Sequence, residues 1–186
     1  MVRVEDLNIT FFHIAKNAGS SIEEWLVRNC NGDAYIDELR HNSPQRLYNL
    51  FDDFGWSFCV IRNPWDRAVS WYRFFVRQKS ITCSFERYLL ESYIHPRPKG
   101  RKYLIPASDQ LRFTTAVHYV IRYENLIEDF KEVQRRTKCD VPLFKVNVSN
   151  VKNEKYVDYY KDKKYIKLVG DYCKKEIDEF GYKFGG

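Results

Sequence analysis

The sequence predicts one α/β domain over residues 1–186, a three-layer sandwich with a short central parallel sheet flanked by helices. Two runs of β-branched and aromatic residues, 9–14 and 56–61, are typical of buried strands. Each run leads through a short turn into a segment with apolar residues at helical spacing. Strands that alternate with helices favour a parallel sheet covered on both faces, and the length suits one domain.

The other elements follow from start signals and periodicity. Apolar residues of 22–28 are spaced as on one face of a helix, and Ser20 or Ser21 is expected to cap it. Pro64, directly after the second strand, predicts another helix start. Further strands are expected at 34–36 and 117–121, and helices at 44–53, 84–94, 107–113, 124–136, 154–161 and 163–180.

The composition describes a globular chain with a moderate basic excess. Aromatic residues make up 17% of the sequence, against only 8 Gly and 6 Pro, which excludes a disordered chain. The formal net charge of +6 suits an anionic ligand. Charge alone leaves nucleotides, nucleic acids and sulfated sugars open as that ligand.

Five cysteines are scattered through the chain, with no CxxC pair and no histidine at a zinc-like spacing. This pattern predicts free thiols, a reducing compartment and no metal site, with Cys59 in the core. No stretch approaches the ~20 apolar residues of a membrane span, and residues 1–7 lack the apolar part of a signal peptide. The chain as given is therefore expected to be soluble and cytoplasmic, although a segment cut from a membrane-anchored precursor would look the same.

The turn after the first strand has the residues of an anion-binding site. A strand–turn–helix unit leaves the first N–H groups of the helix free to face a ligand, and the helix dipole adds to the attraction. Gly19 allows a close approach of the backbone, and Ser20 and Ser21 supply hydroxyl donors. Lys16 adds a full positive charge. The alternative is an ordinary turn with a solvated lysine.

This turn is not a Walker A loop. That motif places its lysine after the second glycine, whereas Lys16 precedes Gly19 by three positions. A P-loop kinase also needs an acidic Mg²⁺ ligand at a strand end, and the second strand is followed by Arg62 instead. A kinase is therefore kept only as an alternative.

The turn after the second strand carries a second anion-binding pattern. Arg62 follows the strand directly, where ligands of open α/β sheets bind. Ser70 lies near the second turn of the next predicted helix. A guanidinium and a hydroxyl that converge there would clamp a phosphate. The alternative for Arg62 is a structural salt bridge, for example to Asp66.

Together these two segments resemble the motifs of the carbohydrate-sulfotransferase family, which includes Golgi polysaccharide sulfotransferases and bacterial and viral relatives. Residues 13–21, HIAKNAGSS, are similar to the family's HxPKTAGTS loop, and residues 62–73, RNPWDRAVSWYR, to its RNPYDRxxSxYR motif. Shorter matches lie in the family's order at 41–44, 121–126, 159–160 and 178–184. Ala15 and Asn17 depart from the usual Pro and Thr, but an asparagine can still bond a phosphate oxygen. A Golgi-lumen location would apply to a trimmed precursor.

The resemblance implies a P-loop-like fold and a sulfotransferase that uses 3′-phosphoadenosine-5′-phosphosulfate (PAPS) and releases adenosine 3′,5′-bisphosphate. It assigns the 5′-phosphosulfate to Lys16, Asn17, Ala18, Gly19, Ser20 and Ser21, and the 3′-phosphate to Arg62 and Ser70. The reaction would be an in-line displacement at sulfur, without a metal ion. Lys16 would be catalytic, because it can stabilise charge on the leaving oxygen.

His41 is the first choice for the general base, since imidazole suits proton transfer near neutral pH. It matches a position where some family members carry a catalytic histidine. The alternative is a surface histidine at a helix start. Glu23 and Glu24 are other possible bases, although acidic residues there also suit the helix dipole. His13 is expected to support the loop from a buried strand.

The acceptor is expected to be a hydroxyl on a carbohydrate or related small molecule, with no nucleic-acid partner. Its specificity would depend on loops around 30–42 and 77–107. A non-catalytic module that binds polyanions is the competing function, because the basic charge and 14 tyrosines permit it. The oligomeric state is left open by the sequence.

Overall fold

In the computed structural model, which describes residues 1–34, 40–47, 53–94, 110–144 and 154–186, the chain forms two units. The sheet unit comprises Met1–Arg62 with Asp109–Val148, and the helical unit comprises Asn63–Ser108 with Ser149–Gly186.

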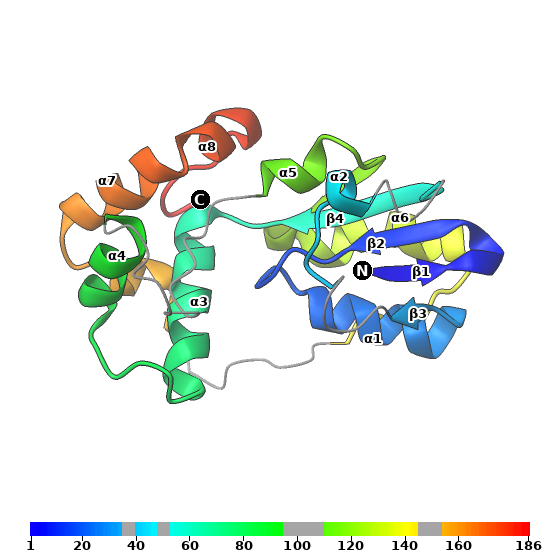
Figure 1. The fold of residues 1–186 in the computed structure, drawn as a ribbon, viewed down its shortest axis with the longest axis horizontal. Helices are drawn as coiled ribbons and strands as arrows, with labels where there is room; N and C mark the ends of the chain where they lie inside the picture. Colours follow the sequence, from blue (N-terminus) through cyan, green and yellow to red (C-terminus); the bar gives the residue numbers. More distant parts are fainter. Residues whose placement is uncertain (35–39, 48–52, 95–109, 145–153) are drawn as a thin grey trace. The chain divides into compact units, whose positions relative to one another are not determined.

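The sheet unit contains five strands and six helical segments (Figure 1). These are β1 (Val2–Val4), η1 (Glu5–Leu7), β2 (Ile9–Phe12), α1 (Gly19–Cys30), β3 (Asp33–Ala34), α2 (Pro44–Leu47), β4 (Trp56–Ile61), α5 (Leu111–Thr114), β5 (Tyr119–Arg122), η2 (Tyr123–Asn125) and α6 (Leu126–Thr137).

The strands form one sheet in the order β3-β1-β2-β4-β5. β2, β4 and β5 are parallel, with Phe11 opposite Phe58 and Val60 opposite Ile121. β1 and β3 are antiparallel to their neighbours. The expected parallel strands thus form the centre of the sheet, and β1 and β3 add an antiparallel edge that was not anticipated. The short hairpin between β1 and β2, which turns at Asn8 in the left-handed conformation, brings β1 back against β2.

Side chains alternate between the two faces of the sheet, as the pleat requires. One face packs against α1 and α6 in a single apolar cluster, in which Trp25 meets Phe130 with ring centroids 5.0 Å apart. On the other face, Phe12 packs against Phe54 and Thr10 donates a hydrogen bond of 2.5 Å to the Phe54 carbonyl. The helices α2 and α5 also contact each other. The predicted α/β three-layer class is confirmed.

The helical unit contains α3 (Pro64–Arg77), α4 (Phe85–Tyr93), η3 (Tyr156–Tyr159), α7 (Lys163–Tyr172) and α8 (Lys174–Phe180). α7 contacts both α3 and α4, as the ribbon also shows (Figure 1). Aromatic side chains fill this unit: Tyr160 donates a hydrogen bond of 3.0 Å to the Trp65 carbonyl and packs against Phe85. The RNPWDR segment thus begins a helix with a packed aromatic face.

Most predicted elements are found within a few residues of their expected bounds. The strand at 56–61 and the helix start at Pro64 match, and Cys59 is buried as expected. β1 was not anticipated, and the helix predicted at 154–161 is a 3-10 turn, η3. Parts of three predicted segments lie outside the described residues. These parts are residues 35–36 of the strand predicted at 34–36, residues 48–52 of the helix predicted at 44–53, and residues 95–107 of the loop region 77–107.

Two findings bear on the sequence-level expectations about compartment. Over the described ranges, no helix has both the length and the apolar character to cross a membrane. All five cysteines have free thiols; Cys59 and Cys173 are buried, and the others are half-buried.

Candidate active site

The turn between β2 and α1 holds its shape through unusual backbone angles. Lys16 and Ala18 have φ values of +71° and +62°, in the left-handed region that non-glycine residues seldom adopt. Ala18 is the N-cap of α1, and no side chain caps this helix. The expectation that Ser20 or Ser21 caps it is therefore wrong, because the helix already begins at Gly19.

The first N–H groups of α1 remain available to a ligand. Within the described part of the chain, no acceptor takes the N–H of Gly19 or of Ser20, whereas Ser21 and Ile22 donate to the Ala18 carbonyl. Uncapped N–H groups at the positive end of a helix dipole attract anions. Lys16 adds its charge from the same turn and is half-buried.

A glycine is needed at position 19 because the ring of His13 lies next to it, not because of its backbone angles. A Cβ atom at this position would lie 1.9 Å from Cδ2 and 2.0 Å from Nε2 of His13. The imidazole of His13, only 4% exposed, therefore packs directly against the start of α1. The expected role of His13 as a support of the loop stays a prediction, and Gly19 has a steric role that the sequence did not reveal.

Gln110 connects the two turns from inside the unit. Its side chain is fully buried, with Oε1 accepting from the Arg62 N–H at 2.8 Å and Nε2 donating to the Arg62 carbonyl at 2.9 Å. The same Oε1 accepts from Asn17 Nδ2 at 2.7 Å, and Asn17 also donates to the Val60 carbonyl at 2.6 Å. The Asn17 amide group thus faces the protein interior and anchors the turn to β4.

Arg62 reaches back to the first turn. Its Nη1 donates to the Lys16 carbonyl at 2.9 Å, and its guanidinium lies over the Tyr123 ring at 3.8 Å from the centroid. A guanidinium stacked on an aromatic face keeps its N–H edges for hydrogen bonds in its own plane. Arg62 therefore joins the two predicted anion-binding turns within the sheet unit.

His41 lies beside the same turn. Its ring packs edge-on against His13, with centroids 4.6 Å apart, and its Nδ1 is 3.1 Å from the His13 carbonyl oxygen. If Nδ1 donates this bond, Nε2 carries the lone pair, as a general base requires. Partial desolvation lowers the pKa of His41, so the ring is neutral near pH 7. The residue is exposed, and an acceptor can approach it.

Glu23 is not the free carboxylate that a second candidate base would need. It is 8% exposed and accepts from His13 Nδ1 at 2.7 Å and from Arg40 Nη2 at 2.5 Å. Burial raises the pKa of Glu23, but the bonds and charges of His13 and Arg40 outweigh it and lower the pKa to about 2. Burial lowers the pKa of His13 to about 4. Glu24 instead pairs with Arg28 on the exposed side of α1.

Ser70 belongs to the helical unit, where it is half-buried on α3. Its assignment to the 3′-phosphate remains a prediction. The start of α3 is closed by its own sequence, because Asn63 Oδ1 accepts from the Trp65 N–H at 3.1 Å and Pro64 occupies the first turn.

Comparison with known proteins identifies the family of the chain. The sulfotransferase family matches residues 1–138, which include both turns, His41 and Gln110. The chain belongs to the sulfotransferase family. It is also 31% identical over 113 residues to an uncharacterized protein of Archaeoglobus fulgidus, across 60% of this chain and 78% of that relative. No solved structure matches it.

Several site residues of this sulfotransferase were missed or misjudged from sequence. Gln110 gave no signal, since an isolated glutamine before a short helix has no motif. Arg40 precedes His41 in the sequence, and an arginine beside a candidate base was a signal that could have been used. Tyr123 occupies an aromatic position in the segment 121–126, but only the fold shows that it stacks on Arg62.

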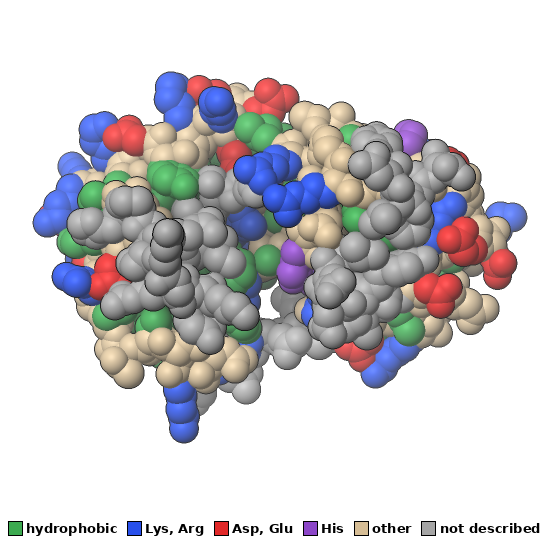
Figure 2. Space-filling view, in the orientation of Figure 1, with side chains coloured by type: hydrophobic (Ala, Val, Ile, Leu, Met, Phe, Trp, Pro, Cys, Tyr) green, Lys and Arg blue, Asp and Glu red, His purple; other side chains and the backbone are tan. Residues whose placement is uncertain are grey.

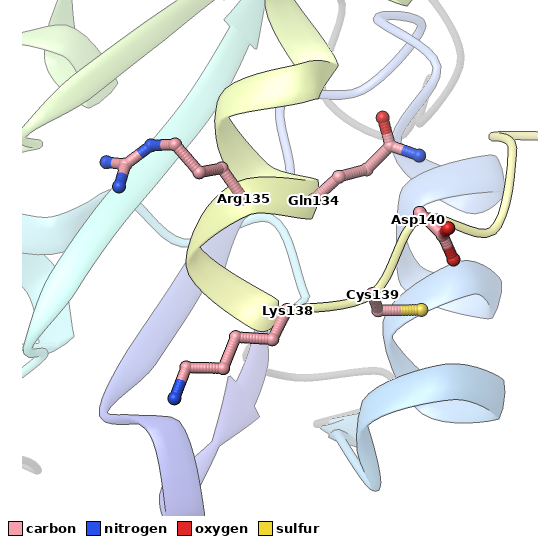
Figure 3. A pocket seen from close by; sticks show the side chains of 5 residues that line it. All are labelled: Gln134, Arg135, Lys138, Cys139 and Asp140. Atoms are coloured by element: carbon pink, nitrogen blue, oxygen red, sulfur yellow. The ribbon is translucent and has the colours of Figure 1, made fainter.

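Other features of the sulfotransferase do not add to the site. A surface pocket of about 450 Å³ lies at the end of α6, lined by Gln134, Arg135, Lys138, Cys139 and Asp140. Figure 3 shows the Arg135 and Lys138 side chains pointing away from those of Gln134 and Asp140. Lys16 follows the carboxyl end of β2. Because α6 runs back from the carboxyl end of β5, the pocket at its far end lies near the amino ends of the parallel strands. Among the described residues, no group of His, Cys, Asp or Glu is arranged to hold a metal ion.

Figure 2 shows Lys and Arg side chains in several separate places on the visible face, some of them next to Asp or Glu. Among the described residues, several basic side chains pair with an acidic residue one helical turn away, such as Arg87 with Glu91 and Lys167 with Asp171.

Proposed function

We propose that this sulfotransferase takes PAPS as its donor and moves the sulfuryl group to an acceptor hydroxyl on a carbohydrate or related small molecule. The observation that carries the proposal is the uncapped start of α1. Free N–H groups, Lys16 and Arg62 lie around one turn, and an exposed histidine stands beside it.

The donor has two anionic groups, and the chain supplies two basic turns that are physically joined. The N–H groups at the start of α1, with Lys16 and Ser20, suit the phosphosulfate. Asn17, Ala18, Gly19 and Ser21 shape and support that turn. Arg62, preorganised by Tyr123, suits the 3′-phosphate, with Ser70 of α3 as a further predicted donor.

In the proposed reaction the acceptor oxygen attacks sulfur while the bond from sulfur to the bridging oxygen breaks. The acceptor proton passes to Nε2 of His41, and adenosine 3′,5′-bisphosphate leaves with the bridging oxygen. Lys16 stabilises the negative charge that develops on that oxygen, an effect that commonly contributes 10²–10³ in rate when a single aimed donor is involved, as an order of magnitude.

The first test is thermal unfolding with adenosine 3′,5′-bisphosphate. At a concentration about 100 times Kd, binding stabilises the native state by about 2.7 kcal/mol, or roughly 5–10 °C in Tm for a chain of this size. The rise is expected in the wild type and in Arg28→Ala, an exposed arginine of α1, and is expected to be lost in Arg62→Ala.

The outcomes separate the alternatives. No rise in the wild type at millimolar bisphosphate would overturn the PAPS assignment. A rise with ATP that depends on Mg²⁺ would point to a kinase instead. Once donor binding is established, transfer of radiolabelled sulfate from PAPS to a panel of sugars and phenols tests the acceptor class, and labelling of phenols alone would refute a carbohydrate acceptor.

A further inference from the structure

The carboxylate of Glu23 has no part in the proposed reaction, yet it is buried at the centre of the site. Only 8% of the residue is exposed, on the second turn of α1. Carboxylates are seldom buried without partners, because removing the charge from water is costly. The partners of Glu23 therefore indicate what it holds in place.

The carboxylate of Glu23 binds two other segments. Oε1 accepts from His13 Nδ1 at 2.7 Å and from Arg40 Nε at 3.3 Å, and Oε2 accepts from Arg40 Nη2 at 2.5 Å and Nε at 3.0 Å. Arg40 Nη2 also lies 3.3 Å from the Ser20 hydroxyl. One carboxylate thus connects the end of β2, the start of α1 and the segment that carries His41.

We propose that Glu23 is a positioning residue, which fixes Arg40 and His13 and through them holds the ring of His41 at the phosphate-binding start of α1. The inference rests on the proposed function, because it takes His41 as the base. It extends that function by naming a charged array, Glu23–Arg40–His13, that aligns the acceptor side of the site with the donor side.

The tautomers are consistent along this array. Glu23 is ionised, so His13 Nδ1 carries the proton of their hydrogen bond. The His13 carbonyl in turn accepts a hydrogen bond from Nδ1–H of His41, which leaves Nε2 of His41 unprotonated. Movement of Arg40 or His13 would therefore turn or displace the His41 ring. A displacement of about 1 Å in a reacting group can cost on the order of 100-fold in rate.

The charges around His41 set the direction of a measurable shift. Among the described residues, the groups that face it are His13, Arg40, the N-terminal amine of Met1, and Glu23. Arg40 and the amine lower the pKa of His41, whereas Glu23 raises it. Replacing Glu23 by neutral glutamine removes the negative charge among these groups, so the pKa of His41 is expected to fall further.

The experiment compares Glu23→Gln with Glu24→Gln, the adjacent carboxylate that pairs with Arg28 on the exposed side. Histidine Cε1–H signals, assigned with His→Gln variants of the four histidines, are followed by NMR against pH. In Glu23→Gln, the His41 midpoint is expected to move to lower pH and kcat to fall on the order of 10-fold to 100-fold. The rise in Tm with bisphosphate is expected to persist, and Glu24→Gln is expected to match the wild type.

An unchanged His41 midpoint and kcat in folded Glu23→Gln would overturn the inference, while bisphosphate binding would still stand. Failure of the wild type to bind bisphosphate would instead refute the proposed function, and the histidine titration would still test the array. If Glu23→Gln does not fold, Arg40→Lys keeps the charge but not the two-point contact. A wild-type midpoint and kcat in that variant would also overturn the inference.

Discussion

The turns after β2 and after β4 look alike in sequence position but handle the helix start in opposite ways. α1 begins after Ala18 in the left-handed conformation, without a side-chain cap and without an acidic residue in its first turn. α3 begins at Pro64, with Asn63 as its cap and Asp66 in its first turn. The start of α1 is open to an anion, and the start of α3 is already satisfied by the chain itself.

Under the proposed function, this difference would give the two turns different chemistry. In the first, the backbone would bind the anion, and its shape depends on Gly19, His13 and Asn17. In the second, the side chain of Arg62, which stacks on Tyr123, would bind it. A strand followed by a turn and a helix therefore does not by itself make a phosphate site; the state of the helix cap decides.

The largest expected effect comes from removing the charge of the first turn. Lys16→Ala is expected to lower kcat by about 100-fold or more, because a lost charge donor at the leaving oxygen is costly. Lys131→Ala, an exposed lysine of α6 paired with Glu128, is the control and should retain full activity. Sulfate transfer from labelled PAPS measures both. Equal rates for Lys16→Ala and wild type would remove the lysine from the mechanism.

A smaller effect, on the free energy of unfolding, is expected when Gly19 is replaced by alanine. Gly19→Ala forces a Cβ atom into the His13 ring, and overpacking of this kind costs about 1–3 kcal/mol. Gly170→Ala, where the new Cβ lies 3.3 Å from Trp65, is expected to change stability by less than about 1 kcal/mol. Urea unfolding measures both changes. Wild-type stability in Gly19→Ala would show that His13 can move aside.

The cap of α3 provides the complementary test. Asn63→Ala loses the bond to the Trp65 N–H and a 2.9 Å bond to the Lys183 carbonyl, at a cost of about 1–2 kcal/mol. Asn63→Asp keeps the capping oxygen and should recover part of this loss. The bisphosphate-induced rise in Tm is expected to persist in both variants. Loss of that rise would mean that the second turn also binds through its backbone.

The last expected effect is on the pH dependence of stability. The pKa of His13 falls from 6.5 to about 4 in the folded protein because of burial. Between these values the unfolded chain binds the proton and the native state does not, so stability falls as the pH is lowered. One group contributes at most about 1.4 kcal/mol per pH unit. In His13→Gln this part of the slope should vanish between pH 6.5 and 4; an identical slope would show that His13 does not titrate this way.

Local patterns predicted much of the fold correctly. The run at 56–61 became β4, and Pro64 began α3, because apolar β-branched runs and a proline at N1 act within a few residues of sequence. β1 was missed since Val2–Val4 is too short to show a period. The antiparallel edge was missed with it, since that edge is formed by β1 and its partners.

The candidate site divides in the same way. Lys16, Gly19, Arg62 and His41 could be named from two spaced motifs and a resemblance. Gln110 and Arg40 could not be named, because their hydrogen bonds form only when the fold brings Asn17, Glu23 and Arg62 beside them. The serine caps were predicted wrongly, because the helix starts before the serines rather than after them.

The sequence by itself determined the class of the chain and the residues that can carry charge to a ligand: strands alternating with helices, a lysine turn and an arginine turn. The tertiary structure alone decided that Glu23 is buried among His13 and Arg40, that Asn17 faces inward, and that Gln110 links both turns. Residue types and spacing act locally, whereas burial, hydrogen-bond partners and pKa values depend on contacts between residues far apart in the chain.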